Sequence, residues 1–368
     1  MEQCDVLIVG GGPAGATAAR ALVTSGLDVV VLDKKPFPRD KVCAGWVTPP
    51  VWEALELNPR DYAAAGNVLQ PINRFRTSLL GGQDVETGYD EVVSYAIRRV
   101  EFDHFLLQRS GARLRLGEGV EKIERVGKRW RINDAIEAAL LIGAGGHACP
   151  VARLLGAELG SGPGVVAAME IEFKMSEEEA ARCPVVGDRP ELFFCTELDG
   201  YGWVVRKGDY LNVGLGREQG LGVAHEMTRF RDMLTGAGKL PPSTPEKFKG
   251  HAYLLYPQPE PRPIFADGVL TIGDASGLAY AQSGEGIRPA VESALLAART
   301  IVQAQGDYSH DRLRAYEQGL EQRFGKRKAY PVAVRFIPAA IKHGIAKWLL
   351  GSALFTRRVL LDRWFLHR

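Results

Sequence analysis

The loop around Cys43 carries a residue type that can move a proton. It reads "RDKVCAGWVT" over residues 39–48, so the cysteine lies between Lys41 and Gly45. A thiol held beside a reacting carbon can donate or relay a proton. The thiol could equally be a small apolar filler, as buried free cysteines often are, so both interpretations stay open.

Two aromatic residues form a second candidate group. Tyr201 and Trp203 stand two positions apart in "GYGWVVRKGDYLNVGLG". If this segment is a strand, the two side chains share one face and could line an apolar site. Aromatic residues are also enriched in sheets, so ordinary core packing is the alternative.

The N-terminal segment has the pattern of a dinucleotide-binding βαβ unit. The apolar runs "DVLIVG" and "DVVVLD" predict buried strands on either side of "GGGPAGATAARALVTSG", which predicts a turn and a helix. Gly10, Gly12 and Gly15 match G-x-G-x-x-G, in which the glycines allow the turn, the approach of a pyrophosphate and close helix packing. We predict that these glycines contact the dinucleotide together with Pro13 and Ala14.

An acidic residue completes this unit. Asp33 ends the second strand, eighteen residues after Gly15. Its carboxylate can accept hydrogen bonds from the ribose of adenosine, and it would repel the 2′-phosphate of NADP. Lys34 and Lys35 follow directly and weaken that exclusion. We predict that Asp33 and Lys34 contact the cofactor.

A second glycine-containing segment specifies which dinucleotide is bound. The stretch "GVLTIGDASGLAYAQSGEGIRPAVESALLAARTIV" predicts a strand ending at Gly273, a loop and a long helix. With the first unit, it resembles the flavoproteins of the para-hydroxybenzoate hydroxylase fold, in which a "GDA" segment binds the ribityl chain of FAD. The resemblance implies that Asp274 accepts a hydrogen bond from a ribitol hydroxyl. It also implies that backbone N–H groups face the flavin pyrimidine at Gly284, Glu285, Gly286 and Ile287, where a helix N-terminus would stabilise negative charge.

Two stretches between these segments fit the same fold. "SYAIRRVEFDHFLLQRSGARL" resembles its arginine-bearing helix, which implies that Arg98 or Arg99 lies near the FAD phosphates. A surface helix with ion pairs is the alternative. In "ALLIGAGGHACPVARLLG", Gly145 replaces the acid that NAD(P)H-using hydroxylases of this fold show in a GADG sequence. Gly145 remains a candidate cofactor contact, and the missing acid argues against a monooxygenase.

Three segments together are similar to the geranylgeranyl reductase family of flavoproteins. They are the cysteine loop, the Tyr-x-Trp segment and "SGEGIRPAVESALLAA", and the resemblance extends to about residue 325. In that family the cysteine loop lies beside the isoalloxazine, and the Tyr-x-Trp segment forms a wall of the polyprenyl cavity. The resemblance implies catalytic-site positions for Cys43, Tyr201 and Trp203, and cofactor contacts for Lys41, Cys43, Ala44 and Gly45.

Two departures from the family pattern bear on the substrate. Val205 and Arg206 replace an aromatic residue and a proline after the Tyr-x-Trp segment. Residues 280–282, "YAQ", stand where the family often has a proline in the loop after GDA. Neither departure touches the FAD segments, so the cofactor prediction is unaffected while the identity of the substrate stays open.

The expected fold class is α/β, with a Rossmann-like FAD-binding domain, an antiparallel β-sheet substrate domain and a C-terminal helical segment. Strand-like runs such as "VVAAMEIEFKM" and "ELFFCTEL" indicate the antiparallel sheet. The expected boundaries are 1–66 with 95–160 and 268–325 for the FAD-binding domain, 67–94 with 161–267 for the substrate domain, and 326–368 for basic amphipathic helices.

Positive charge is concentrated at the C-terminus. Residues 323–368 contain eleven Lys or Arg and one acid, Asp362, so this segment carries +10 while the whole chain carries +2. Aromatic residues interleave with the cations, including Tyr330, Phe336 and Trp348. This combination suits helices on an anionic membrane surface. Apolar faces that close over the protein body are the alternative, and no motif accompanies the charge that would indicate nucleic-acid binding.

Cysteine usage and the N-terminus indicate the compartment. The five cysteines are odd in number and lack CxxC spacing, which argues against a disulfide framework and against a metal site. The start, "MEQCDVLIVG", has acids where a signal peptide has basic residues, and the chain has no apolar run of about eighteen residues. We expect a cytoplasmic protein, with the inner face of the membrane as a peripheral location.

The resemblance implies an FAD-dependent oxidoreductase that reduces carbon–carbon double bonds of a polyprenyl, geranylgeranyl-type lipid with hydride from reduced flavin. The alternatives are an FAD monooxygenase acting on an apolar or aromatic substrate and a flavin redox sensor in which Cys43 is a switch. Residues 42–121 contain no lysine, which argues against a halogenase. No second G-x-G-x-x-G unit is present, so the electron donor is open between reduced ferredoxin and NAD(P)H.

Overall fold

The chain forms two compact units. The computed structural model describes residues 1–158, 164–218, 222–328, 344 and 347–367. The first unit comprises residues 1–40, 100–160 and 253–330, and the second comprises residues 41–99, 161–252 and 331–368. Residues 41–66 and 95–99 therefore group with the second unit, although we expected them in the FAD-binding domain. The division into functional domains with the expected boundaries stays a prediction.

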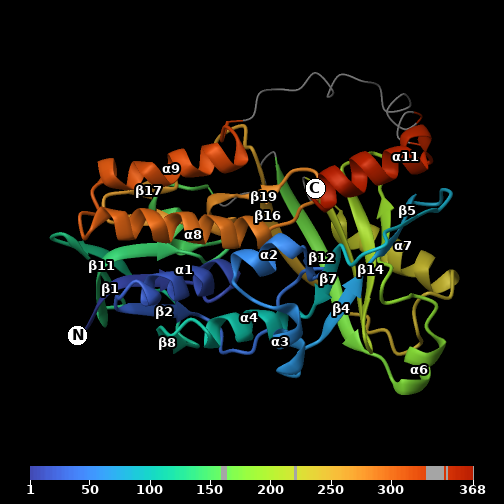
Figure 1. The fold of residues 1–368 in the computed structure, drawn as a ribbon, viewed down its shortest axis with the longest axis horizontal. Helices are drawn as coiled ribbons and strands as arrows, with labels where there is room; N and C mark the ends of the chain where they lie inside the picture. The colour runs from blue at the N-terminus through green and yellow to red at the C-terminus, as the bar shows by residue number, and fades with distance from the viewer. Residues whose placement is uncertain (159–163, 219–221, 329–343, 345–346, 368) are drawn as a thin grey trace. The chain divides into compact units, whose positions relative to one another are not determined.

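A mostly parallel sheet forms the centre of the first unit (Figure 1). Its strands follow the order β17-β18-β11-β1-β2-β8, and β10 and β9 extend it from β11. Val6 of β1 pairs with Leu140 on one side and Val29 on the other, both in parallel register. The strands are β1 (Glu2–Val9), β2 (Val29–Asp33), β8 (Arg113–Leu116), β9 (Ile123–Val126), β10 (Arg129–Ile132), β11 (Ile136–Gly143), β17 (Phe265–Ala266) and β18 (Val269–Thr271).

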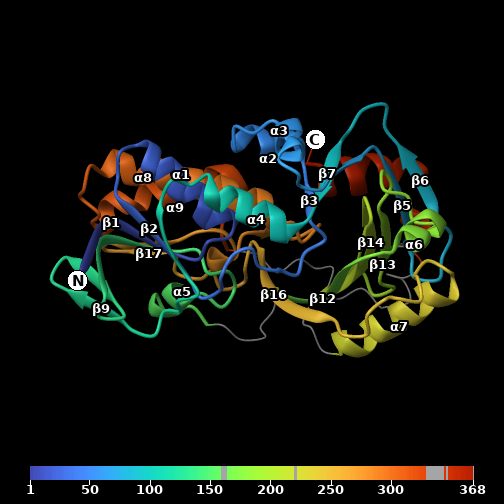
Figure 2. The ribbon, with the colours of Figure 1, turned by 90° about the horizontal axis from the view of Figure 1, so that it is seen from below.

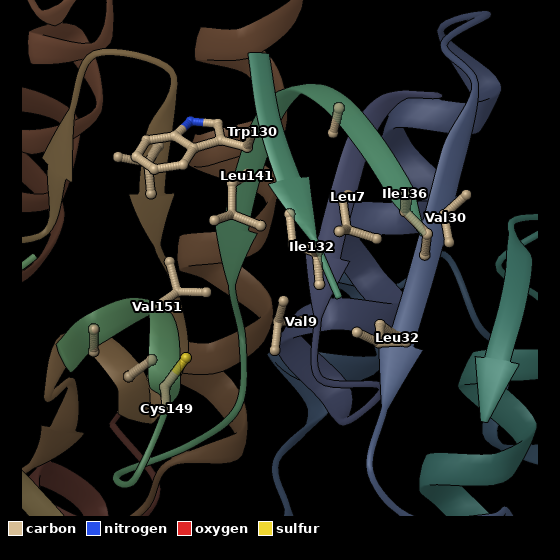
Figure 3. Close-up of a cluster of buried hydrophobic side chains, with 14 of the residues drawn as sticks. Leu7, Val9, Val30, Leu32, Trp130, Ile132, Ile136, Leu141, Cys149 and Val151 are labelled. Carbon is tan, nitrogen blue, oxygen red and sulfur yellow. The ribbon is translucent and has the colours of Figure 1, made fainter. Parts of the chain in front are cut away.

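Apolar side chains are buried against the faces of this sheet, as continuous apolar runs predict for parallel strands. Figure 3 shows Leu7, Val30 and Leu141 in one cluster from three strands. Trp130 of β10 belongs to the same cluster, and its indole N–H donates to the carbonyl of Gly268 at 2.6 Å. This core holds the carboxyl ends of β1 and β2 in fixed register.

Helices cover the sheet of the first unit, and helix α1 packs along α8, which packs along α9 (Figures 1 and 2). Helix α1 buries Ala14, Ala16, Ala18 and Ala19, and these small side chains allow close approach of its neighbours. The helical elements are α1 (Pro13–Thr24), α4 (Arg99–Gln108), α5 (Pro150–Leu154), the 3-10 turn η1 (Gly273–Ser276), α8 (Ile287–Ala304) and α9 (His310–Phe324).

The second unit is built on a larger, mainly antiparallel sheet with the order β16-β12-β15-β14-β13-β5-β6. Strands β12, β15, β14 and β13 pair antiparallel in turn, as do β5 and β6, while β13 pairs with β5 in parallel. Strand β16 continues into the first unit, where Leu255 pairs with Ala279 of β19 (Ala279–Tyr280). The strands are β5 (Arg74–Leu79), β6 (Val85–Gly88), β12 (Val165–Lys174), β13 (Glu191–Phe194), β14 (Gly200–Lys207), β15 (Tyr210–Glu218) and β16 (Lys249–Tyr256).

Smaller elements complete the second unit. Helix α7 packs on β12 and β15 and buries Met227, Phe230 and Leu234 in the core of this unit (Figure 2). A three-stranded antiparallel sheet lies in the order β3-β7-β4. The elements are β3 (Trp46–Val47), β4 (Leu69–Ile72), β7 (Ser94–Ile97), α2 (Pro49–Ala54), α3 (Pro59–Ala64), α6 (Glu177–Arg182) and α7 (Val223–Gly236).

The described part of the C-terminal segment contains α11 (Ala353–Phe355) and a π-helix, η3 (Thr356–Phe365), which contacts β6 (Figure 1). Leu360, Leu361 and Phe365 are buried, so this part closes over the second unit, while Trp348 is 75% exposed. Tyr330 and Phe336 lie outside the described residues. Within the described chain, no helix is both long enough and apolar enough to cross a membrane.

Candidate functional site

The glycine turn of the first unit is built around the start of α1. A Cβ at Gly15 would collide with the carbonyl oxygen of Gly10, and a Cβ at Gly10 would collide with the carbonyl of Ala144. Gly10 also has φ = +116°, a conformation that favours glycine. These two positions therefore serve the turn and the close packing of helix on strand, as the motif predicts.

Gly12 has a different environment, which is open toward a ligand. Among the described atoms, a Cβ placed there would meet only the Arg39 guanidinium, at 3.4 Å. Gly12 is the N-cap of α1 without a side-chain hydrogen bond, and Pro13 occupies the first turn. The first N–H groups of α1 therefore lack a side-chain cap, which is the arrangement that binds a pyrophosphate. The turn fits the diphosphate of FAD.

Asp33 fastens the end of β2 to this turn. Its Oδ2 accepts a hydrogen bond from the Gly11 N–H at 2.8 Å, and its Oδ1 accepts one from the Lys35 N–H at 2.9 Å. Each carboxylate oxygen can accept a further hydrogen bond, so Asp33 retains acceptor capacity for the expected ribose contact, which stays a prediction. Lys34 is exposed, and its contact with the cofactor also stays a prediction.

Arg39 is a residue of this site that the sequence reasoning missed. Its Nε lies 3.9 Å from Asp33 Oδ2, and its guanidinium lies 3.4 Å from Asp103 Oδ2. The side chain also lies over the Phe37 ring, 4.6 Å from its centroid. A cation a few residues after an acid-terminated strand was the available signal. The structure places it beside Gly12, where it can face an anion.

The second cofactor segment is assembled in the same unit. Asp274 lies in η1 directly after β18, and a Cβ at Gly286 would be 3.0 Å from its Oδ1. Gly286 is the N-cap of α8 and has no side-chain cap. Gly273, on the other side of Asp274, donates its N–H to Ser293 Oγ at 3.0 Å. The turn of residues 284–287 and Asp274 are therefore neighbours, as the resemblance implies; their contacts with FAD remain a prediction.

Glu285 has an unusual electrostatic position in this turn. Both of its carboxyl oxygens are buried, although the residue as a whole is partly exposed. Burial raises the pKa of Glu285 to about 8; Arg288 lowers it, and Glu292 raises it. The raised pKa favours the protonated carboxyl group at neutral pH, which reduces the negative charge at the start of α8.

The remaining predicted cofactor residues lie in two places. Gly145 follows β11, where a Cβ would be 3.2 Å from Cys149 Sγ. Arg98 donates from Nε to Glu172 Oε1 at 3.0 Å, and its guanidinium lies 3.7 Å from the centroid of the Tyr210 ring. Arg99 is buried, as are Phe102 and Asp103 of α4, so one face of this helix packs in the interior. Arg98 and Asp103 also form ion pairs, so the ion-paired surface helix stays open as the alternative. Phosphate contacts of these arginines stay a prediction.

The cysteine loop lies in the second unit. Cys43 is half-buried, and its Sγ accepts a hydrogen bond from the Gly45 N–H at 3.3 Å. Lys41 and Ala44 are half-buried and Gly45 is buried. All five cysteines are free thiols. Within the described ranges, no group of His, Cys, Asp or Glu is placed to hold a metal ion.

Tyr201 and Trp203 lie on β14 with their ring centroids 6.0 Å apart, so they share a face as the spacing predicts. Trp203 is only 6% exposed, and its Nε1 donates to Asn212 Oδ1 at 2.7 Å. Its ring packs against Gly214, where any Cβ would collide with it. Trp203 is thus a core residue of the sheet, and its assignment to a substrate cavity stays a prediction.

Phe365 from η3 is an unexpected neighbour of these aromatics. Its ring centroid lies 5.4 Å from that of Tyr201, 5.5 Å from Trp46 and 6.2 Å from Phe194. Trp46 also stacks on Phe75 at 5.1 Å. We call these residues, with Trp203, the aromatic cluster. The sequence offered no signal for this contact, because it joins residues far apart in the chain.

The glycine turn at residues 10–15, Asp33 and the Asp274 turn have the arrangement expected of an FAD-dependent oxidoreductase. A family model described as FAD dependent oxidoreductase matches residues 5–98. Over 372 residues the chain is 30% identical to the digeranylgeranylglycerophospholipid reductase of Methanothrix thermoacetophila, covering 89% of this chain and 85% of that protein. An uncharacterised protein of Methanosarcina barkeri is 31% identical over 307 residues, covering 82% of this chain and 75% of that protein.

The solved structure of a geranylgeranyl bacteriochlorophyll reductase-like protein from Thermoplasma acidophilum has the same fold. The TM-score is 0.78 at 20% identity, and the match covers 99% of this chain and 97% of that one. The chain belongs to the geranylgeranyl reductase family of FAD-dependent oxidoreductases, and FAD is its cofactor. The predicted family, fold class and cofactor are confirmed.

Proposed function

We propose that this enzyme reduces carbon–carbon double bonds in the geranylgeranyl chains of a membrane lipid. The observation that carries the proposal is the 30% identity to a digeranylgeranylglycerophospholipid reductase, in a match that covers 85% of that reductase. The aromatic cluster of the second unit supports it, because Tyr201 and Trp203 share a sheet face and such rings suit an apolar, unsaturated chain.

The first unit would hold the cofactor. The Gly10–Gly15 turn and the N-terminus of α1 would bind the diphosphate, Asp33 the ribose, and Asp274 the ribityl chain. When bound and reduced, FAD supplies a hydride to one carbon of the double bond. A protonated Glu285 would leave the start of α8 free to stabilise negative charge nearby.

The second carbon of the double bond needs a proton, which we assign to Cys43. The electron pair of the double bond would form the new C–H bond with the thiol proton. The thiolate left behind would then take a proton from solvent. The Gly45 N–H, 3.3 Å from Sγ, would stabilise that thiolate. Tyr201 and Trp203 would orient the chain, and neither is required to transfer a proton.

We also propose that the C-terminal segment docks on an anionic membrane, where such a lipid resides. The described residues Lys347, Arg357 and Arg358 are exposed, and Trp348 and Leu354 are 75% and 62% exposed. Cations beside exposed apolar side chains suit the interface of an anionic bilayer. The apolar face of η3 is used for packing, so docking would involve its outer face and the residues before it.

The proposed reaction is tested by mass spectrometry of a digeranylgeranyl glycerophospholipid after incubation with dithionite-reduced holoprotein, with and without oxygen. We expect a gain of two hydrogens for each double bond in the anaerobic sample. A gain of one oxygen atom, only in air, would identify a monooxygenase instead. An unchanged lipid in both samples, with flavin that is still reduced and reoxidised normally, would contradict the proposal and favour a redox sensor.

A further inference from the structure

Side chains of the antiparallel sheet hold the main chain of Cys43 on both sides. The Cys43 N–H donates to Glu170 Oε2, and the Cys43 carbonyl accepts from Asn212 Nδ2 at 3.2 Å. The Gly45 carbonyl accepts from the Ile97 N–H at 2.8 Å. Loops are usually the most mobile part of a fold, so a loop held by hydrogen bonds at both Cys43 and Gly45 indicates a demand for precise position.

The orientation of the Asn212 side-chain amide is fixed by Trp203, whose indole N–H can only donate a hydrogen bond. The indole Nε1 of Trp203 donates to Asn212 Oδ1 at 2.7 Å, which turns the amide nitrogen toward the Cys43 carbonyl. The same amide nitrogen lies 3.2 Å from Glu172 Oε2. Trp203, Asn212 and the Cys43 carbonyl therefore form a chain of hydrogen bonds with one consistent direction.

A buried ion pair lies next to these hydrogen bonds. Lys207 is 0% exposed, and its Nζ is 2.6 Å from Glu172 Oε2, the oxygen that Asn212 also contacts. A Cβ at Gly45 would be 2.7 Å from Lys207 Nζ and would collide with the Ile97 carbonyl. The Lys207 ammonium group therefore packs next to Gly45, and this position has no space for a larger side chain.

The sheet register places these groups on one face. Asn212 is paired with Glu172 on β12 and with Val205 on β14. Glu170 and Glu172 are two apart on β12, and Trp203 and Lys207 are four apart on β14, so each pair shares a face. Three adjacent strands thus contribute to one polar group under the cysteine loop.

Stability alone does not account for this arrangement. Burial by itself raises the pKa of Glu172, but Lys207, Asn212 and Arg98 outweigh it, so the net pKa is below the usual value and the group is ionised. A buried ion pair is commonly no more stabilising than apolar residues of the same size. A geometric role explains better why charges occupy a sheet interior.

We propose that Asn212, Glu172 and Lys207 are positioning residues for the Cys43 thiol. Asn212 holds the Cys43 carbonyl directly, while Glu172 and Lys207 hold Asn212 and support Gly45 from below. The effect of this positioning on turnover rests on the proposed function, but the positioning itself does not. The positioning is measured through the reactivity of the thiol, without any lipid substrate.

The main test uses Asn212→Leu, which keeps the side-chain shape and removes the donor. We expect iodoacetamide at fixed pH to alkylate Cys43 about tenfold faster than in the parent holoprotein, the factor that corresponds to one hydrogen bond. Peptide mapping identifies the modified cysteine, and the half-buried Cys183 serves as the internal reference. In turnover, kcat should fall about tenfold with KM nearly unchanged, since binding contacts are retained.

The second variant is the double substitution Glu172→Gln/Lys207→Met, which removes the two charges of this pair together. Arg98 also pairs with Glu172, but its side chain is 19% exposed and so keeps contact with solvent. Its matched control is Glu191→Gln/Lys239→Met, because Glu191 on β13 of the same sheet is 0% exposed and lies 2.5 Å from Lys239 Nζ, which follows α7. Of these two double variants, we expect only Glu172→Gln/Lys207→Met to alkylate Cys43 faster than the parent.

Equal Cys43 alkylation in the parent, Asn212→Leu and both double variants would overturn the proposal. An equal change in the Glu191/Lys239 control would also overturn it, because the effect would then be a general loosening of the sheet. A faster alkylation in the two test variants with unchanged kcat would support the positioning role and would instead contradict the assignment of Cys43 as proton donor.

Discussion

The ring of Phe365, at the end of η3, lies 5.4 Å from the ring of Tyr201 on β14. Phe365 is 4% exposed, so the C-terminal helix closes one side of the aromatic cluster. The tail that the sequence marks as basic therefore also supplies a side chain to the apolar interior of the second unit.

Substitution of Phe365 should affect both stability and substrate binding. Phe365→Ala removes a buried ring and should lower the free energy of unfolding by about 3 kcal/mol. Phe365→Leu should cost less and raise KM for the lipid more than it lowers kcat. Chemical denaturation and steady-state kinetics measure these effects, with the half-buried Phe355→Ala as control. Unchanged kinetics in Phe365→Leu would exclude a substrate role for this ring.

Two alanine substitutions in the glycine turn should have different effects. At Gly15 a Cβ collides with the Gly10 carbonyl, so Gly15→Ala should destabilise the protein. At Gly12 a Cβ meets only Arg39 at 3.4 Å within the described chain, so Gly12→Ala should fold and lose FAD. Flavin absorbance and thermal unfolding separate the two outcomes. Gly236→Ala, with open space around it, is the control. Full FAD content in Gly12→Ala would contradict the proposed diphosphate site.

Glu285 should make stability depend on pH. Its pKa is raised from 4.5 to about 8, mainly by burial, so the folded protein retains a proton that the unfolded chain releases. Stability should therefore fall as the pH rises through this interval, by at most about 1.4 kcal/mol per pH unit, and then level off.

Glu285→Gln removes that dependence, so its Tm relative to the parent should rise between pH 5 and pH 8. Thermal unfolding of the holoprotein across this range measures the difference, with the exposed Glu178→Gln as control. A Tm difference that is constant with pH would show that Glu285 is ionised throughout.

Membrane docking predicts a loss of vesicle binding without loss of the fold. Deletion of the whole tail is a poor test, since it would also remove Phe365 from the aromatic cluster. Trp348→Ser combined with Lys347→Glu and Arg358→Glu changes exposed side chains alone. We expect binding to phosphatidylglycerol vesicles to weaken at least about tenfold, since each cation contributes roughly 1 kcal/mol. Binding equal to that of the Arg182→Glu control would disprove this surface.

The cofactor half of the site was readable from the sequence because its motifs are local. Gly10, Gly15 and Asp33 are close together in the chain, and each requirement is set by the backbone around it. Arg39 was missed, although it lies in the quoted cysteine stretch, because no fixed spacing relates it to the glycine turn.

The second unit was less predictable because its site depends on strand register. Trp203 and Asn212 are nine residues apart and meet only because β14 and β15 pair with Val205 opposite Asn212. A lysine is rarely buried, yet Lys207 at the end of β14 is buried against Glu172. The position of Phe365 depends on the packing of η3, which the amphipathic pattern of the tail does not specify.

The most direct test of the central claim is anaerobic mixing of dithionite-reduced holoprotein, freed of excess reductant, with a digeranylgeranyl glycerophospholipid. We predict that the lipid alone restores the absorbance of oxidised flavin, with one double bond saturated for each flavin reoxidised. Flavin that stays reduced in the presence of the lipid, yet reoxidises when oxygen is admitted, would contradict prenyl reduction by this enzyme.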